Sequence, residues 1–234
     1  MKLLAIDTSG AACSAALLHD GVLTQRLEHA PRRHGELILS MMDALLSDDG
    51  LAARDLDALA FGCGPGSFTG LRIAAAVVQG VAFGAGLDVV GVSTLAALAQ
   101  GCRRRDGADH VLCAFDARMG EVYWGAYRVD PNGLMRPLGD DVVCAPEAVW
   151  MPEFEQQQPA GAAWSGVGSG WVVYGEVLSS RVGVTLSLSG ADQECEARDI
   201  AMLARDAVER GEARSPEQAI PVYLRNQVTA VPRG

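Results

Sequence analysis

The chain has 234 residues, with 29 Asp and Glu against 19 Lys and Arg, which gives a formal net charge of −10. This length suits one large domain or two lobes of roughly 100 residues each. The acidic balance lacks the basic footprint of a nucleic-acid-binding protein, and the six cysteines form no CxxC pair of the kind that binds zinc. The N-terminus has too short an apolar run for a signal peptide, and no 18-residue apolar stretch is free of polar breaks and glycines. We therefore expect a soluble cytoplasmic protein with reduced thiols.

Three short strands open the chain and are expected to pair antiparallel, at residues 2–6, 12–18 and 22–28. Asp20-Gly21 is a strong hairpin signal between the second and third strands. A helix follows over residues 34–46, in which the polar side chains occupy one narrow stripe and all others are apolar. Because a helix on one sheet needs an apolar arc only somewhat over 100° wide, the surplus predicts burial on two sides.

A second unit of strand and helix surrounds a glycine-rich loop at residues 62–70. The strand precedes the loop within residues 55–61, and an almost uncharged helix over 71–85 follows it. The loop is not a phosphate-binding Walker A loop, because Leu71 and Arg72 follow its last glycine. This helix is also apolar nearly all round.

A strand at 88–92 and a helix starting at Ser93 or Thr94 and ending near Cys102 complete a first lobe, residues 1–107. Alternating strands and helices predict parallel pairing with right-handed crossovers. We interpret the run Arg103-Arg104-Arg105 as a solvated helix end, where cations are favoured by the helix dipole.

The second lobe spans residues 108–234. Paired strands are expected at 111–116 and 122–129, and Asn132-Gly133 predicts a type I′ turn followed by another strand. The remaining predicted elements are a short helix within 146–159, a strand at 164–171 that leads into a glycine turn, a weakly patterned stretch at 179–194, an amphipathic helix at 196–210, and an extended segment at 221–228 that packs back on the first lobe.

Few residues are arranged for chemistry. Asp7, Thr8 and Ser9 end the first strand, where they form either a turn that binds phosphate and hydrated magnesium or an ordinary turn that satisfies its own backbone. Asp116, Arg118 and Glu121 form either a catalytic cluster or, as we favour, an ion-paired hairpin or partner contact. The four histidines stand alone, and Ser67 lacks a histidine at a recognisable spacing.

Seven motifs, in the order of the chain, resemble the TsaB (YeaZ) family over residues 1 to about 228: LLAIDTS, ACSAALLHDG, RRHGELILSMMDALL, GCGPGSFTGLRIAAAVVQGVAFG, VVGVSTLAALAQ, FDARMGEVYWGAY and PVYLRN. The resemblance implies an α/β fold of the actin-like ATPase, sugar-kinase and Hsp70 class (ASKHA, RNase H-like), with two lobes of which the second is reduced. It also implies a non-catalytic accessory role beside TsaD, which transfers the threonylcarbamoyl group from threonylcarbamoyl-AMP to N6 of adenosine 37 in tRNAs that read codons beginning with A.

The family pattern carries expectations for particular residues. In TsaD the segment matching residues 92–98 holds two metal-binding histidines four residues apart, whereas this chain has Thr94 and Leu98. Leucine cannot ligate a metal, so we expect neither a catalytic residue nor a metal ligand here. We expect vestigial phosphate loops at Asp7, Thr8 and Ser9 and at Gly168, Ser169 and Gly170, no tightly bound cofactor in the chain alone, and ATP or ADP with Mg only at the level of a complex.

The same resemblance implies partners. These are TsaD in a heterodimer, TsaE in a ternary complex and a second copy in a homodimer, with tRNA contacted only indirectly and no membrane. Apolar helices would meet in a four-helix bundle. The interface candidates are His34, Leu37, Ile38, Met41, Met42, Leu45, Arg72, Ala75, Val78 and Gln79. A charge at Leu37 or Met41 is expected to prevent self-association and leave the monomer folded.

Two alternatives stay open. One is an ATP-binding, kinase-like enzyme, suggested by residues 5–9 and the glycine loops. The other is a metallopeptidase-like protein, which the missing HxxxH pair disfavours. Tight binding of Mg-ATP or of one equivalent of metal would distinguish them from an accessory protein.

Overall fold

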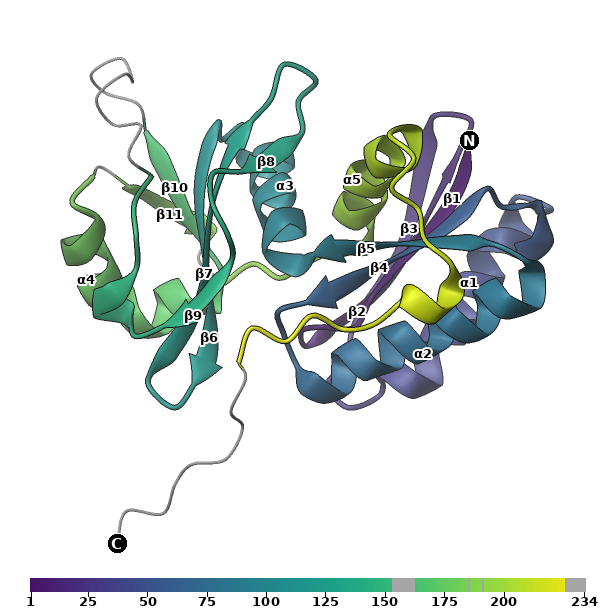
Figure 1. Ribbon diagram of the computed structural model, residues 1–234, viewed down its shortest axis with the longest axis horizontal. Helices are drawn as coiled ribbons and strands as arrows, with labels where there is room; N and C mark the ends of the chain where they lie inside the picture. Colours follow the sequence, from purple (N-terminus) through teal and green to yellow (C-terminus); the bar gives the residue numbers. More distant parts are fainter. Residues whose placement is uncertain (153–162, 185, 191, 226–234) are drawn as a thin grey trace, which may run out of the picture.

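The computed structural model describes residues 1–152, 163–184, 186–190 and 192–225, which form two α/β lobes side by side (Figure 1). The first sheet has the strand order β3-β2-β1-β4-β5. Strands β1 to β3 pair antiparallel, and β1, β4 and β5 pair parallel. The strands are β1 (Lys2–Asp7), β2 (Ala12–His19), β3 (Val22–His29), β4 (Ala58–Gly64) and β5 (Asp88–Ser93).

Helices cover both faces of the first sheet because its central strands are apolar on both sides. In β1, Leu4 and Ile6 face the core cluster of α1 (His34–Asp48) and α2 (Phe68–Ala85), whereas Leu3 and Ala5 face α5 (Ala197–Glu209). This alternation follows the two-residue period of a strand. Alanines are frequent on both sides of the α5 contact, which lets that helix lie close to the sheet.

The second sheet repeats the order of the first. Read from β8, its order is β8-β7-β6-β10-β11, with antiparallel pairs up to β6 and parallel pairs after it, while β9 pairs with β7. The strands are β6 (His110–Arg118), β7 (Glu121–Val129), β8 (Met135–Pro137), β9 (Val142–Cys144), β10 (Trp164–Val167) and β11 (Leu186–Gly190). This is the two-lobed ASKHA-type fold that the resemblance implies.

The second lobe has fewer helices of its own. The described residues between β9 and β10 contain only the one-turn η2 (Pro146–Ala148) where the first lobe has α1, and α4 (Ser169–Val182) follows β10 as α2 follows β4. The first lobe adds the one-turn helices η1 (Ala53–Asp55) and η4 (Pro216–Gln218).

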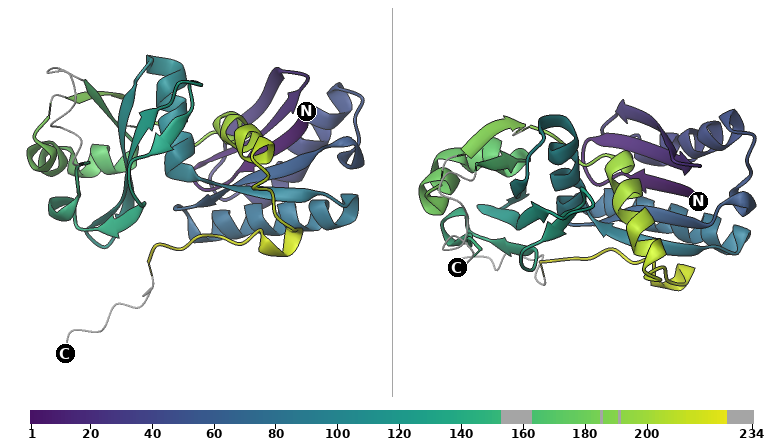
Figure 2. Two further views of the ribbon diagram at one scale, coloured as in Figure 1. Left: turned by 45° about the horizontal axis from the view of Figure 1, so that its top comes forward. Right: turned by 90° about the horizontal axis from the view of Figure 1, so that it is seen from above.

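The two lobes exchange helices. Helix α3 (Thr94–Asp106) leaves the first sheet and packs on β6, β7 and β8 of the second, whereas α5 leaves the second sheet and packs on β1, β2 and β4 of the first. Figure 2 shows α3 and α5 lying next to each other between the sheets. The predicted division at residue 107 placed the α5 segment in the second lobe, but the chain returns to the first lobe from about residue 194 onward.

Ion pairs join the two exchanged helices. Arg104 donates to both carboxylate oxygens of Asp199, at 2.9 and 2.8 Å, and to Glu196 at 3.0 Å, while Arg105 donates to Glu196 at 2.8 Å. Asp199 is buried, and the hydrogen bonds that Arg104 donates to it raise the pKa of Arg104, which therefore stays charged. Interpreting this basic run as a solvated helix end is therefore wrong for Arg104 and Arg105, because acids of α5 cover them.

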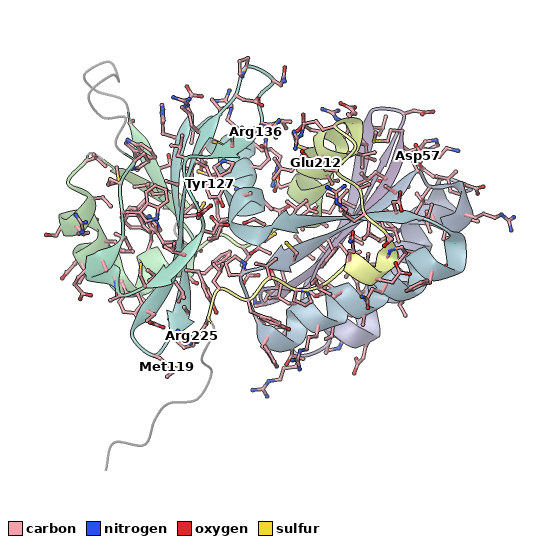
Figure 3. The ribbon with its side chains drawn as sticks, in the orientation of Figure 1. Asp57, Met119, Tyr127, Arg136, Glu212 and Arg225 are labelled. Carbon is pink, nitrogen blue, oxygen red and sulfur yellow. The ribbon has the colours of Figure 1, made fainter. Side chains whose placement is uncertain are left out.

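The C-terminal segment bridges the lobes on the side of α2. Its Val222 N–H donates to the Cys63 carbonyl at 2.7 Å, as expected for a segment that packs back on the first lobe. Farther along, Arg225 pairs with Glu121 and lies 3.5 Å from the sulfur of Met119, beside the β6–β7 hairpin (Figure 3). The end of the predicted segment, residues 226–228, lies outside the described residues.

Most predicted elements agree with the structure, and three differ. The predicted strand over 164–171 ends at Val167, and Trp171 belongs to α4, a helix that was not predicted. The weakly patterned stretch contains β11 and the last turns of α4. In the Asn132-Gly133 turn only Gly133 has a positive φ, so the turn is not type I′, although β8 does follow. Residues 153–159 of the predicted short helix lie outside the described residues.

We predict that Arg104→Ala lowers the free energy of unfolding by about 3 kcal/mol, because it leaves the buried Asp199 carboxylate without its cation. Arg103→Ala is the matched control. Arg103 pairs with the exposed Asp109, so its loss should cost less than about 1 kcal/mol.

Urea unfolding monitored by tryptophan fluorescence measures both variants. Equal costs for the two arginines would contradict the assigned role of Arg104. The double variant Arg104→Met with Asp199→Leu should recover much of the lost stability, since it removes both buried charges together.

Candidate functional site

The turn after β1 is the first candidate site. Asp7 is buried, and its Oδ2 accepts hydrogen bonds from the Ser9 amide at 3.2 Å and the Ser9 hydroxyl at 3.0 Å. Its Oδ1 lies against Gly62 and has no hydrogen-bond partner among the described residues. Burial raises the pKa of Asp7 to about 7, against the opposing hydrogen bonds from Ser9. The carboxyl therefore keeps its proton to a higher pH than an exposed aspartate does.

The glycine-rich loop closes over this turn. The Thr8 hydroxyl donates to the Gly70 carbonyl at 2.7 Å, and the Ser67 amide donates to the Ser9 carbonyl at 2.8 Å. A Cβ on Gly66 would stand 2.8 Å from the Ser9 carbonyl oxygen. A Cβ on Gly70 would overlap the Thr8 carbonyl oxygen. These glycines are needed because two backbones meet here, so the loop is a tight packing turn.

The second predicted phosphate loop occupies another place than expected. Gly168, Ser169 and Gly170 follow β10 and begin α4, and Gly168 and Gly170 pack against Ala114 of β6. The Ser169 hydroxyl accepts a hydrogen bond from the Asp116 amide at 3.1 Å. Because the second sheet repeats the first, the counterpart of the Asp7 turn is the hairpin at 116–120. By topology, residues 168–170 correspond to the 62–70 loop, and a phosphate loop at these residues stays a prediction.

The charged hairpin between β6 and β7 is an ion-paired turn. Arg118 pairs with Asp116 at 2.8 Å, and Glu121 pairs with Arg225 of the C-terminal segment. Arg118, Met119 and Gly120 all have positive φ, and the Met119 side chain is 64% exposed. Of the two interpretations left open, the ion-paired turn is confirmed for these residues.

The positions that match the TsaD histidines belong to the core. Thr94 is fully buried, and its hydroxyl donates to the Pro65 carbonyl. Leu98 is fully buried among α3, β6 and β10. Both side chains are therefore committed to packing.

A partly buried polar network lies beside Thr94 and was not predicted. Asp141 accepts hydrogen bonds from the hydroxyls of Ser93, at 2.6 Å, and of Tyr127, at 2.5 Å. Burial raises the pKa of Asp141, and these two hydrogen bonds oppose the shift. The network ties the end of β5 to the second lobe. No local pattern could have shown it, because its members lie far apart in the sequence.

The predicted partner-binding residues divide into buried and accessible ones. Seven of the ten are buried within the first lobe and cannot form a docking surface, namely His34, Ile38, Met41, Met42, Leu45, Ala75 and Val78. Leu37 and Gln79 are partly exposed, and Arg72 is exposed. The correction has a simple cause: α1 and α2 bury these side chains against their sheet and against each other.

Other residues of the same helices remain uncovered. Helix α2 is long and apolar enough to cross a membrane by length and composition alone, as many core helices of soluble proteins are, yet only 33% of it is buried. Phe83 is 57% exposed and Leu39 of α1 is 52% exposed. A Cβ on Gly80 or Gly84 would meet nothing within 4 Å. We define the α1–α2 face by Leu39, Ala76, Gly80, Phe83 and Gly84.

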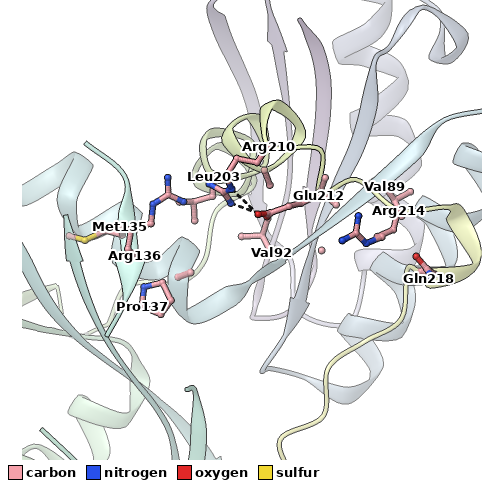
Figure 4. A pocket seen from close by; sticks show the side chains of 14 residues that line it. Val89, Val92, Met135, Arg136, Pro137, Leu203, Arg210, Glu212, Arg214 and Gln218 are labelled. Atoms are coloured by element: carbon pink, nitrogen blue, oxygen red, sulfur yellow. Dashed lines mark hydrogen bonds and ion pairs between the residues drawn. The ribbon is translucent and has the colours of Figure 1, made fainter. Parts of the chain in front are cut away.

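A cavity of about 300 Å³ lies between β5, β8 and α5 (Figure 4). It contains arginine side chains that are already paired. Arg136 binds Asp130 and Asp206, and Arg210 binds Glu212 through two hydrogen bonds of 2.7 and 2.9 Å. Arg214 also lines the cavity and donates to the main-chain carbonyls of Gly211 and Ala213, with no ion pair among the described residues.

The comparisons with known proteins agree with this geometry. Residues 22–231 match the family model described as "TsaD: tRNA N6-adenosine threonylcarbamoyltransferase". The chain is 42% identical to the tRNA threonylcarbamoyladenosine biosynthesis protein TsaB of Escherichia coli K12, over 97% of this chain and 96% of that protein. It is 38% identical to TsaB of Haemophilus influenzae, over 98% and 95% of the two chains.

A solved structure of YeaZ from Pseudomonas aeruginosa is 46% identical, with a TM-score of 0.86, and the match covers 95% of this chain and 99% of that one. The fold and the matched motifs thus define a two-lobed ASKHA-type protein related to TsaD. Within that class, the chain belongs to the TsaB family of tRNA threonylcarbamoyladenosine biosynthesis proteins.

We predict that Asp7→Asn makes stability less dependent on pH. The folded carboxyl holds its proton up to about pH 7 and an unfolded one only to about pH 4, so the folded state binds more protons between these values. Stability of the wild type therefore falls as pH rises from 4 to 7.

Between pH 5 and pH 8 the free energy of unfolding should fall by about 2–3 kcal/mol more in the wild type than in Asp7→Asn. Urea titrations at both pH values test this. Parallel pH profiles for the two proteins would contradict the raised pKa.

We also predict that Gly70→Ala destabilises the chain by about 3 kcal/mol or more, because the added methyl overlaps the Thr8 carbonyl. Gly80→Ala on the open side of the same helix should instead stabilise by about 0.5–1 kcal/mol. Thermal unfolding distinguishes them, and a tolerated Gly70→Ala would show that the turn and loop are not in close contact.

Proposed function

We propose that this chain is a non-catalytic accessory subunit in the synthesis of threonylcarbamoyladenosine in tRNA. In this role it supports TsaD, which transfers the threonylcarbamoyl group to N6 of adenosine 37 in tRNAs reading codons that begin with A. Membership of the TsaB family supports the pathway. The accessory role is supported by Thr94 and Leu98, whose side chains are buried in the core at the positions of the TsaD metal ligands.

The α1–α2 face is the surface that we propose to dock TsaD. The observation that carries this proposal is the uncovered apolar side of α2, together with Phe83 and Leu39. Small residues on α2 allow another helix to approach closely, so a pair of helices from the partner would complete a four-helix bundle. A second copy of this chain competes for the same face and forms the homodimer in the absence of TsaD.

The remaining components act at the level of the complex. The Glu194 carboxylate accepts hydrogen bonds from the two amides that follow the Asp7 turn. This contact supports the proposal that the chain does not bind nucleotide tightly by itself. We propose that ATP or ADP with Mg is bound in the complex, that TsaE joins as a third partner, and that tRNA is contacted only indirectly, in keeping with the net charge of −10. The complex would act in the cytoplasm.

We predict that Phe83→Glu and Leu39→Glu abolish binding to the TsaD protein of the same organism and leave the monomer folded. A charge on an exposed position costs the monomer little, but it would be buried without a partner in a helical interface. Met41→Glu should unfold the chain, because Met41 is only 8% exposed.

Size-exclusion chromatography with light scattering measures the complexes, and circular dichroism checks the fold. Arg181→Glu, on α4 of the other lobe, is the control and should bind as the wild type does. Normal complex formation by Phe83→Glu and Leu39→Glu would overturn the assignment of this face.

A further inference from the structure

The cavity between β5, β8 and α5 has no part in the proposed function. Figure 3 shows two of its residues, Arg136 and Glu212, at the edge of the molecule opposite to Met119 and Arg225. At about 300 Å³ it has the volume of a small binding pocket. Most of its lining residues are apolar, namely Val89, Val90, Val92, Ala96, Met135, Pro137, Leu203 and Ala207.

One wall of the cavity is the outer edge of β5, the last strand of the first sheet. At this edge the Val89 amide donates to the Arg214 carbonyl at 2.7 Å, and the Arg214 amide donates to the Val89 carbonyl at 2.9 Å. Successive residues of a strand turn their main-chain groups to opposite edges, so the N–H and C=O of Gly91 point outward as those of Val89 do. Gly91 is exposed and lines the cavity.

The segment at Arg214 shows which position beside β5 is open. It forms an antiparallel bridge with Val89, and a continued antiparallel ladder would bring Glu212 opposite Gly91. The segment instead turns away before Arg214, because the Glu212 amide donates to the Ala207 carbonyl near the end of α5. A further strand can therefore be added at Gly91, and it must end where the chain's own segment begins.

Arg214 is the cation beside this open position. Its Nη1 donates to the carbonyls of Gly211 and Ala213 at 3.3 and 3.1 Å, and it has no ion pair within the part of the chain that the structure describes. In Figure 4 its side chain points from the C-terminal segment toward Glu212 and Val92. The guanidinium has five N–H donors, so it retains donors for an added anion.

The charges around the cavity determine the direction of an added strand. Glu212 is already bound by Arg210 through two hydrogen bonds, and Asp206 is bound by Arg136 and Arg210. An antiparallel strand opposite Gly91 has its carboxyl end toward Arg214, which brings opposite charges together. A parallel strand would bring a cationic amino end to the same guanidinium, where the charges repel.

We propose that this cavity binds the carboxyl-terminal end of another polypeptide, which adds a short antiparallel strand to the free edge of β5. The last residue of the ligand lies opposite Gly91 and donates its N–H to the Gly91 carbonyl. The terminal carboxylate accepts from the Gly91 amide and from the Arg214 guanidinium. The apolar side chains of the ligand lie against Val90, Val92 and Leu203. This inference does not rest on the accessory role, which would stand if it failed.

Titration calorimetry with the peptide acetyl-alanyl-valyl-valine tests the proposal on the full chain. The peptide with a free carboxyl group should bind with a Kd of about 0.1–1 mM. The same peptide amidated at its C-terminus should bind at least about tenfold more weakly, because it lacks the charge that Arg214 binds. Methylation of the nitrogen of the last valine should weaken binding to a similar extent, because it removes the donor to Gly91.

Two variants test the same contacts from the side of the protein. Arg214→Ala should weaken binding of the free acid about tenfold, whereas Arg205→Ala, exposed on α5 and outside the cavity lining, is the control and should bind as the wild type does. Gly91→Pro removes the outward N–H, which an edge strand tolerates, and should also weaken binding. Circular dichroism checks that each variant is folded.

Nitrogen–proton NMR spectra give the second readout, in which the free acid should shift the Gly91 amide signal of the wild type. The proposal is wrong if the free acid does not bind up to about 10 mM, if acid and amide bind equally, if Arg214→Ala binds as the wild type does, or if the Gly91 signal does not move. If Gly91→Pro fails to fold, the methylated peptide tests the main-chain pairing in its place, and its normal binding would contradict the added strand.

Discussion

The exchange of α3 and α5 between the two sheets is the constraint on which the rest of the molecule depends. Each helix covers the sheet of the other lobe, so neither lobe has its full core without the other. The contact between the helices is fixed by Arg104, whose guanidinium is shared by Glu196 and the buried Asp199. A buried ion pair adds little net stability, but breaking it by removing one partner is costly, because the other charge stays buried and unpaired.

This arrangement decides which surfaces are free. The face of the first sheet that meets α5 is closed by a helix rich in alanine, and the turn after β1 is closed by the 62–70 loop on one side and by Glu194 on the other. The opposite face carries α1 and α2; the C-terminal segment lies against the start of α2, whereas the α1–α2 face stays exposed in the described part of the chain. The filled turn and the exposed α1–α2 face support the proposal that this chain docks a partner protein.

Local sequence patterns predicted most of the helices and strands. The predictions failed where contacts between residues far apart in the sequence determine the structure. The strands of the first lobe were found because their residues are apolar and bounded by turn signals such as Asp20-Gly21. The start of α4 was missed because Trp171, Val172 and Val173 are typical of a strand, while packing of Trp171 on Leu112 and Trp124 determines the helix.

Most of the predicted interface residues on α1 and α2 are buried, although the same two helices carry exposed apolar residues. The apolar surplus of α1 and α2 is visible in the sequence, yet it cannot show which neighbour covers each side chain. Met41 and Val78 proved to be core residues, whereas Leu39 and Phe83 are exposed. The Glu194 contact and the Asp141 network were beyond prediction for the same reason, since their partners meet only in the folded chain.

The most direct test of the account is a reconstituted transfer assay with purified proteins, unmodified tRNA and threonylcarbamoyl-AMP, in which modified adenosine is measured by mass spectrometry. The account predicts no product from this chain alone and more product when the chain is added to TsaD than with TsaD alone. Product formed by this chain without TsaD would contradict the accessory role, and so would a TsaD activity that the chain leaves unchanged.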